Sequence, residues 1–231
     1  MADRSVLVTG STGGLGAAVT AAFVDAGWRV VAPQRQQPTP TRRPEANAPV
    51  RLVADLTDPK DAARAAEVAA GDPAAPLRAV VNLVGGYAST GLVHETSIDD
   101  FDRMLTLNLR PTHLVTRAAL PHLVTAGGGA VVCMAARAAL TPFPGVAGYV
   151  TAKAAVLGFA AAVAVEYKNA GVRCNTVLPS VIDTPTNRDS MPGADQSRWV
   201  DPAEIASVIR FLASDESAPT SGAAVPVYGR A

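Results

Sequence analysis

Short apolar runs alternate with alanine-rich stretches along this chain. Most residues of the runs are β-branched or small, and the runs are continuously apolar, as in strands that are buried on both faces. They cover residues 6–9, 29–32, 50–54, 79–84, 130–134 and 172–178. Helical stretches between successive strands are typical of parallel sheets. The pattern predicts an α/β fold: one domain over residues 1–231, with a doubly wound parallel sheet flanked by helices on both faces.

Polar residues mark where several helices are expected to begin. Asp58 precedes a proline, Ser97 has an acidic residue three positions later, and Asp201 precedes a proline with Glu204 in the capping-box position. These residue types accept hydrogen bonds from the free N–H groups of a first helical turn. We therefore predict capping roles for them. The stretch 33–49 has no apolar period and is predicted to be a loop after the second strand.

Composition and charge narrow the possible partners. The chain is 48% hydrophobic, and its 20 basic residues balance its 20 acidic ones. Without an excess of positive charge, neither nucleic acid nor a membrane is an expected partner. Cys133 and Cys174 lie in apolar strands and are expected to be small core residues. The first residues lack the apolar stretch of a signal peptide, so a cytoplasmic protein is predicted.

A glycine-rich turn follows the first strand and leads into a helical run. It reads Thr9-Gly10-Ser11-Thr12-Gly13-Gly14-Leu15-Gly16. Such a turn lets a pyrophosphate approach the free N–H groups and the positive dipole end of a helix, where Cβ atoms would hold it away. The alternative is an ordinary glycine-rich turn. We predict dinucleotide binding by Gly10, Ser11, Thr12, Gly14, Leu15 and Gly16.

The glycine spacing T-G-x-x-x-G-x-G is one of several motifs that occur in a characteristic order. The others are Asp55-Leu56, Asn82-x-x-Gly85, Asn108, Tyr149-x-x-x-Lys153, Pro179 and Thr184. Together they resemble the classical short-chain dehydrogenase/reductase family over the whole chain. The resemblance implies that the cofactor is also contacted by Asp55, Leu56, Asn82, Gly85, Lys153, Pro179, Ile182 and Thr184. It also implies a small-molecule substrate and a homodimer or homotetramer.

Tyr149 and Lys153 are four residues apart and would share one face of a helix. A tyrosine that acts as an acid or base near neutral pH needs its pKa lowered by about three units, or about 4 kcal/mol. Lys153 is expected to supply the positive charge that does so. The resemblance implies that Lys153 also holds the nicotinamide ribose and that Asn108 anchors a water in a proton relay. Alternatively, Asn108 is a polar helix residue bonded to backbone.

The cofactor preference depends on the end of the second strand. An acidic residue there would bind the ribose hydroxyls and repel a 2′-phosphate, but this chain has Gln34 followed by Arg35. An arginine can pair with the 2′-phosphate, so NADP(H) is favoured and NAD(H) is possible. Alternatively, Arg35 begins a solvated basic loop with Arg42 and Arg43. The three histidines have no metal-ligand spacing, and no metal is implied.

One position departs from the family pattern. The serine that most members carry thirteen residues before the tyrosine is Ala136 here. The segments 135–140, 144–149 and 178–199 resemble the dihydropteridine reductase branch, which lacks this serine. In that branch an aromatic residue after two glycines lies beside the substrate, and Tyr87 has this place. We expect Tyr87 and Ala136 to face the substrate, Tyr87 either stacked on a flat ring or packed on its loop. A lid is expected at about 184–200.

Three functions remain open. The first is an NAD(P)H-dependent reductase that transfers hydride to a small acceptor, such as a quinonoid dihydropterin or another flat conjugated C=N or C=O compound. The second is a general NADPH-dependent carbonyl reductase or alcohol dehydrogenase. The third is a non-catalytic NADP-binding regulatory protein. Tyr149, Lys153 and Asn108 together favour an enzyme, because a binding module needs no activated tyrosine.

Overall fold

The computed structural model describes residues 2–37 and 47–230. Within them, seven parallel strands form one sheet with the order β3-β2-β1-β4-β5-β6-β7. The strands are β1 (Ser5–Val8), β2 (Arg29–Gln34), β3 (Val50–Val53), β4 (Leu77–Asn82), β5 (Gly129–Met134), β6 (Val172–Pro179) and β7 (Ala224–Val227). The predicted doubly wound parallel sheet is confirmed.

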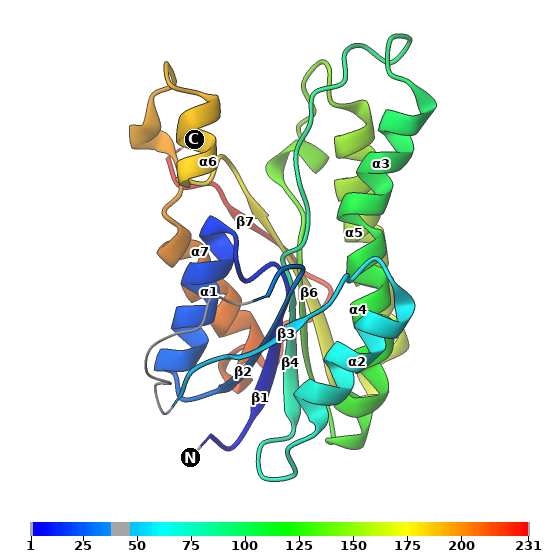
Figure 1. Ribbon diagram of the computed structural model, residues 1–231, viewed down its shortest axis with the longest axis vertical. Helices are drawn as coiled ribbons and strands as arrows, with labels where there is room; N and C mark the ends of the chain where they lie inside the picture. The colour runs from blue at the N-terminus through cyan, green and yellow to red at the C-terminus, as the bar shows by residue number, and fades with distance from the viewer. Residues whose placement is uncertain (1, 38–46, 231) are drawn as a thin grey trace.

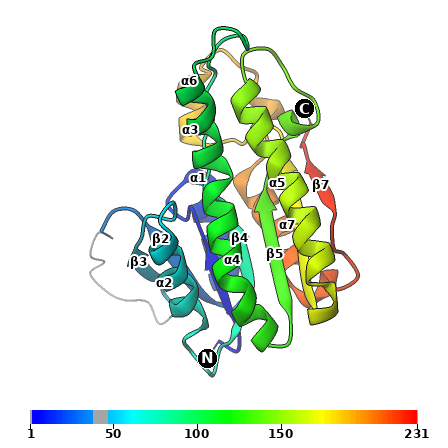
Figure 2. The ribbon, with the colours of Figure 1, turned by 90° about the vertical axis from the view of Figure 1, so that its right-hand side faces the viewer.

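Helices cover both faces of the sheet (Figures 1 and 2). One face carries α1 (Gly14–Asp25) and α7 (Pro202–Ala213), and the other carries α2 (Pro59–Ala70), α4 (Arg110–Thr125) and α5 (Ala147–Glu166). Helix α3 (Ile98–Asn108) packs on α5, and the short α6 (Pro185–Ser190) follows β6. Successive strand residues point to opposite faces. Accordingly Leu7 belongs to one buried apolar cluster, whereas Val6 and Val8 belong to the other.

The structure differs from the sequence-based expectation at two strands. β2 continues to Gln34, so the predicted loop 33–49 begins with strand residues, and its residues 38–46 lie outside the described part. β1 pairs with β2 only as far as Val31, so Pro33 has a strand partner on one side only. β7, which was not predicted, is the edge strand and contains Pro226. Edge positions tolerate the missing N–H of proline.

The predicted helix starts are confirmed where the caps were expected. The Asp58 carboxylate accepts hydrogen bonds from the backbone of the first turn of α2. Ser97 caps α3, and Asp201 accepts from Ala203 N at 2.7 Å at the start of α7. These bonds occupy N–H groups that have no partner within the helix. The caps therefore fix the first turns of three helices.

Helix α5 is apolar along most of its length. Among residues 2–37 and 47–230, it alone is long and apolar enough by composition to cross a membrane. In the fold it packs against β6 and α3, with Val156 and Val163 buried. Burial in the core thus accounts for one side of this helix, whereas its other side is exposed.

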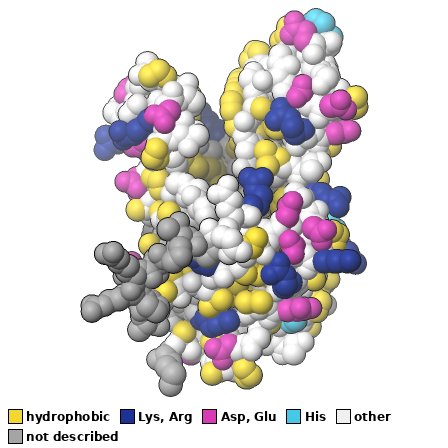
Figure 3. All heavy atoms as spheres, in the orientation of Figure 1, with side chains coloured by type: hydrophobic (Ala, Val, Ile, Leu, Met, Phe, Trp, Pro, Cys, Tyr) yellow, Lys and Arg dark blue, Asp and Glu magenta, His cyan; other side chains and the backbone are white. Residues whose placement is uncertain are grey.

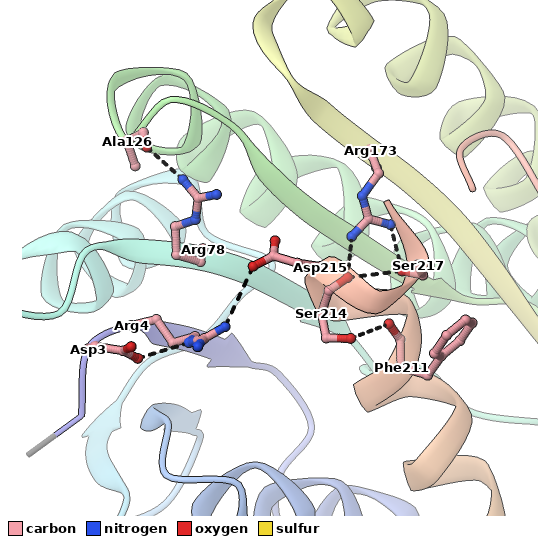
Figure 4. A network of polar contacts seen from close by, with 9 residues as sticks. All are labelled: Asp3, Arg4, Arg78, Ala126, Arg173, Phe211, Ser214, Asp215 and Ser217. Carbon is pink, nitrogen blue, oxygen red and sulfur yellow. Dashed lines mark hydrogen bonds and ion pairs between the residues drawn. The ribbon is translucent and has the colours of Figure 1, made fainter. Parts of the chain in front are cut away.

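A single arginine joins β6 to the segment that follows α7 at the amino ends of the strands (Figure 4). The Arg173 guanidinium donates to the carbonyl oxygens of Leu212, Ser214 and Thr220 and to the Ser217 hydroxyl, at 2.8–3.2 Å. Carbonyl groups without a partner are costly when they are removed from water. Arg173 is therefore a structural residue that fixes the chain between α7 and β7.

We expect Arg173→Gln to lower the free energy of unfolding by about 2–3 kcal/mol, because several carbonyl groups lose their donor together. Urea unfolding followed by circular dichroism measures this change. Arg103→Gln is the matched control, since Arg103 has one exposed ion pair with Asp100, and its effect should stay within about 0.5 kcal/mol. Equal effects of the two variants would show that the Arg173 contacts do not contribute as described.

Candidate active site

The predicted site residues converge at the carboxyl ends of the strands. Most of them lie at the ends of β1, β4, β5 and β6, which are neighbours in the sheet, or on the helices that follow, while Arg35, Asp55 and Leu56 follow β2 and β3. Above this edge the molecule is hollowed between a lobe that contains α6 and a lobe that contains α3 and the start of α5 (Figure 3). Ligands of doubly wound sheets bind at this edge. The arrangement places the glycine loop and the Tyr149 helix on two sides of one cleft.

The glycine loop has almost no room for side chains. Gly10 has a φ of +67°, and a Cβ atom at Gly16 would lie 2.0 Å from the Gly10 carbonyl oxygen. A Cβ atom at Gly14 would lie 2.8 Å from Thr184 Cγ2. These distances explain why the three positions are glycines. They also show that the loop contacts the segment after β6.

The start of α1 fits a phosphate group. Its N-cap residue, Gly13, makes no side-chain cap, unlike the capped starts of α2, α3 and α7. Nearby, the buried Ser11 Oγ is without a hydrogen-bond partner in the described part of the chain. Uncapped N–H groups and the helix dipole favour an anion. The residues present thus fit the pyrophosphate of a dinucleotide, which Ser11, Thr12 and the loop backbone would hold.

Tyr149 and Lys153 lie on α5 and meet residues from two other segments. The Tyr149 ring packs edge-on against Tyr87, with 5.3 Å between ring centroids. Lys153 Nζ lies 5.9 Å from the Tyr149 ring centroid and donates to the Met134 carbonyl oxygen at 3.1 Å. Tyr87 is exposed to solvent, whereas Lys153 is only 5% exposed. The predicted pair is therefore present, with Tyr87 beside it.

Asn108 connects the end of α3 to the loop after β4. Its Oδ1 accepts from Gly86 N, and its Nδ2 donates to the carbonyl oxygens of Gly86 and Met104, all at 3.0 Å. A Cβ atom at Gly85 would lie 2.7 Å from Asn108 Oδ1 and 3.1 Å from Lys153 Nζ. The side chain is thus bonded to backbone, as in the alternative interpretation from sequence. It positions the loop that carries Tyr87.

The protein's own groups shift the pKa values of the pair in a direction that the sequence did not predict. Burial raises the pKa of Tyr149 to about 12, and the neighbouring Tyr87 phenol contributes in the same direction. Burial lowers the pKa of Lys153 to about 8. Lys153 is not among the causes of the Tyr149 shift, so the expected lowering of the tyrosine pKa is not found for the protein residues alone, where burial disfavours the phenolate.

Polar residues near the ends of β2 and β3 occupy the region expected for the adenosine ribose. Arg35 is exposed, and its positive charge is a minor cause of the lowered pKa of Asp55, which is due first to hydrogen bonds from Thr57. Gln34 Nε2 donates to the Gln36 carbonyl oxygen. Arg35 and Asp55 therefore lie near each other, as the motifs imply, while Arg42 and Arg43 lie outside the described residues.

Besides Ser11 and Lys153, three further predicted cofactor residues have side chains that are buried within the protein. Asn82 is 2% exposed, and its Nδ2 donates to Thr116 Oγ1 at 2.9 Å and contacts Cys133 Sγ at 3.8 Å. Leu56 and Pro179 are buried as well. Direct contact of the Asn82 side chain with a cofactor does not fit this packing, because the side chain joins β4 to α4 and β5. Sequence spacing alone did not separate this structural role from a binding role.

The expected lid forms a closed loop. Ile182 and Val200 make a parallel bridge at its base, where Asp183 N donates to the Val200 carbonyl oxygen at 2.8 Å. Within it lie α6, which Thr184 caps, and a single turn at 196–198. Arg188 makes a bidentate ion pair with Asp183 at 2.5 and 2.6 Å. The segment is therefore folded onto the site by its own contacts.

Sequence reasoning missed several contributors to the site. Thr9 Oγ1 accepts from Leu83 N at 3.0 Å and so fixes the end of β4 beside the glycine loop. The Met134 carbonyl oxygen binds Lys153, a backbone role that no side-chain motif could reveal. Ala136 is buried beside this carbonyl group, and the next residue, Arg137, is half-buried. Arg137 could have been singled out from the sequence, because it is the one charged residue among four alanines in 135–139.

Comparison with known proteins gives consistent matches over the chain. A family model described as short chain dehydrogenase matches residues 4–195. A 2-(R)-hydroxypropyl-CoM dehydrogenase from Xanthobacter autotrophicus is 33% identical over 245 residues, which cover 98% of this chain and 98% of that protein. A D-threitol dehydrogenase from Mycolicibacterium smegmatis is 31% identical over 247 residues, which cover 98% and 92%.

Solved structures share the fold. A short-chain type dehydrogenase/reductase from Mycobacterium ulcerans has a TM-score of 0.89 at 25% identity and covers 100% of this chain and 90% of its own. A putative NAD(P) dependent gluconate 5-dehydrogenase from Beutenbergia cavernae, with NADP bound at low occupancy, has a TM-score of 0.85 at 25% identity, with 99% and 96% covered.

We expect Lys153→Met to abolish activity and yet to stabilise the protein at pH 7. The native pKa lies about 2.5 units below the ordinary value of 10.5, so the buried charge costs about 3 kcal/mol below pH 8. This cost declines between pH 8 and 10.5, as native Lys153 loses its proton while the unfolded chain still binds one. Thermal unfolding from pH 7 to 10 measures both effects. A variant less stable than the native protein at pH 7 would contradict this account.

Proposed function

Because the chain belongs to the short-chain dehydrogenase family, we propose that it oxidises a secondary hydroxyl group of a small molecule with NAD(P)⁺ and reduces the corresponding carbonyl in reverse. The observation that carries the proposal is the placement of Tyr149 and Lys153 across one cleft from the glycine loop. The relatives named above as dehydrogenases of hydroxylated compounds agree with this reaction. None of them is named as a pterin reductase, so the quinonoid dihydropterin acceptor has no support there.

In the proposed reaction, Tyr149 Oη accepts the proton of the substrate hydroxyl during oxidation and returns it during reduction. A bound nicotinamide supplies hydride transfer and, when oxidised, a positive charge. Lys153, held by the Met134 carbonyl oxygen, keeps its charge beside the tyrosine below about pH 8. Asn108 keeps the Gly85–Gly86 backbone next to this ammonium. A water relay through Asn108 stays a proposal by resemblance to the family.

We propose that Tyr87 supplies the hydroxyl donor that Ala136 lacks. The Tyr87 ring lies 5.3 Å from that of Tyr149, and its phenol is close enough to raise the pKa of Tyr149. Both tyrosines thus border the place where a substrate oxygen would accept a hydrogen bond. A donor aimed at this oxygen stabilises the charge that develops there during ketone reduction.

We propose NADP(H) as the preferred cofactor, with NAD(H) as the alternative. Arg35 is exposed at the end of β2 and has no carboxylate partner in residues 2–37 and 47–230 within ion-pair distance. A free guanidinium at this place suits a 2′-phosphate. The neighbouring Asp55 carboxylate weakens the preference, because it would repel the same phosphate.

We further propose that the chain forms a homodimer or homotetramer. The outer face of α5 is exposed and consists mainly of small residues: Thr151, Ala154, Gly158, Ala161, Ala162 and Val165. Small residues permit close approach of a second helix, and Val165, which is 73% exposed, adds an apolar side chain to the same face.

The direct test is oxidation of small secondary alcohols with NADP⁺ and NAD⁺, and reduction of the matching ketones, by the native protein and by Tyr149→Phe. We expect turnover in the variant to fall at least about a hundredfold, because proton transfer is lost. Binding of NADPH, followed by its fluorescence, should change little. Cofactor binding without turnover in the native protein would favour the non-catalytic regulatory function instead.

The role of Tyr87 is tested by combining two substitutions. We expect Tyr87→Phe to lower kcat/KM for a simple ketone by about tenfold or more, because one hydrogen-bond donor is removed. Ala136→Ser should restore much of this loss in the Tyr87→Phe background and add less in the native protein, since the two hydroxyls serve the same oxygen. Steady-state kinetics of the four proteins measure the coupling. Strictly additive effects would remove Tyr87 from this role.

A further inference from the structure

A half-buried arginine follows directly after Ala136. Arg137 begins the single turn 137–139 after β5, in a segment that otherwise contains alanines. Its guanidinium makes no hydrogen bond or ion pair with any residue in the described part of the chain. A charged side chain that is partly withdrawn from water and has no charged partner lowers the stability of the fold. Such side chains are found at functional sites.

The contact that Arg137 does make leaves its donors free. Its Cζ lies 5.0 Å from the centroid of the Tyr228 ring, in a cation–π arrangement. Tyr228 is itself held in place, because Ser180 Oγ donates to its carbonyl oxygen at 2.8 Å. Stacking uses the face of a guanidinium, whereas its five N–H groups point outward in the plane. Arg137 thus lies over the Tyr228 ring, and no described residue uses its N–H groups.

This arginine lines a shallow, open cavity of about 430 Å³ together with Val181, Asp195, Arg198 and Trp199. The cavity joins the segment after β5, where Arg137 directly follows Ala136, to the segment after β6 and to the segment 184–200. Arg198 uses Nε to reach the Arg230 carbonyl oxygen at 3.2 Å. The Asp195 carboxylate is engaged by the backbone and hydroxyl of Ser197. The lining thus contains two guanidinium groups and one carboxylate.

We propose that this cavity binds an oxyanion group of the substrate, in the simplest case a carboxylate, with Arg137 as the main anchor and Arg198 as the second. The proposal rests on the proposed alcohol oxidation and names its substrate class: a small secondary alcohol that carries an anionic group away from the reacting carbon. A planar fork of N–H groups matches a carboxylate in a bidentate manner, and its charge makes each hydrogen bond stronger.

The experiment uses the native protein and a series of hydroxy acids, 3-hydroxybutyrate, 4-hydroxypentanoate and 5-hydroxyhexanoate, each paired with its amide. The acid and the amide of each pair have the same carbinol group, and only the acid carries a negative charge at the other end of the molecule. At the best chain length, we expect kcat/KM for the acid to exceed that for the amide by about tenfold or more. Arg137→Gln should reduce this ratio at least about tenfold, mainly through KM of the acid, because a binding contact is lost.

Two variants serve as controls. Arg137→Lys keeps the charge but not the fork, and should retain an intermediate ratio. Arg103→Gln removes an exposed positive charge on α3 and should leave the ratio unchanged. A purely structural role of Arg137 would change the rates for acid and amide equally. That result, or a ratio near one in the native protein, would overturn the proposal.

A binding measurement separates this proposal from the reaction itself. Pentanoate has the carboxylate but no hydroxyl group, so it cannot react. Titration with pentanoate should change the fluorescence of Trp199, which lines the cavity, and the signal should disappear in Trp199→Phe. Arg137→Gln should weaken the apparent affinity about tenfold or more. If no alcohol is oxidised but this binding is found, the proposed reaction fails and the anion site remains. Absence of binding overturns the site.

Discussion

The carbonyl oxygen of Gly10 lies where a Cβ atom of residue 16 would be, and this close approach organises the functional end of the molecule. It requires glycine at position 16 and brings the first turn of α1 directly against the end of β1. The same turn places Gly14 against Thr184, which caps α6. The end of β1, the glycine turn and the segment after β6 therefore share one packing arrangement. A larger side chain at position 10, 14 or 16 would displace the start of α1 and the segment after β6 together, and would thereby change the cleft between them.

Features that depend on neighbours in sequence could be predicted from the chain alone. The buried strands, the caps Asp58, Ser97 and Asp201, and the glycine turn each follow from short patterns. Features that depend on long-range neighbours could not. Whether Pro33 can lie in a strand depends on where β1 stops, and Asn82 is structural because Thr116, 34 residues away, accepts its hydrogen bond. The folded environment, and not the motif, decides such roles.

Tyr149 and Lys153 show the same limit in their energetics. The spacing of Tyr149 and Lys153 predicted that they share a helix face, and this placement follows from helical geometry. The direction of the tyrosine pKa did not follow, because burial of the phenol among α5, Tyr87 and the β4 loop disfavours its ionised form. A buried lysine at the same place is also costly. The site thus concentrates buried polar groups that weaken the fold, and the Met134 carbonyl oxygen offsets part of the cost by accepting a hydrogen bond from Lys153.

Ala136 and Arg137 are adjacent, and together they suggest how this chain fixes a substrate without the usual serine. A hydroxyl at position 136 would hold the reacting oxygen from the β5 side of the cleft. If Tyr87 is the donor, Tyr87 and Tyr149 both contact the substrate oxygen from one side of the cleft, because their rings are in contact. One wall alone leaves a small alcohol free to rotate about the reacting carbon. The proposed anchor at Arg137, which contacts Tyr228, would remove this freedom and hold the carbinol hydrogen in one orientation. An anchoring charge far from the reacting carbon can thus compensate for a missing hydrogen-bond donor beside it, because both restrict the orientation of the substrate.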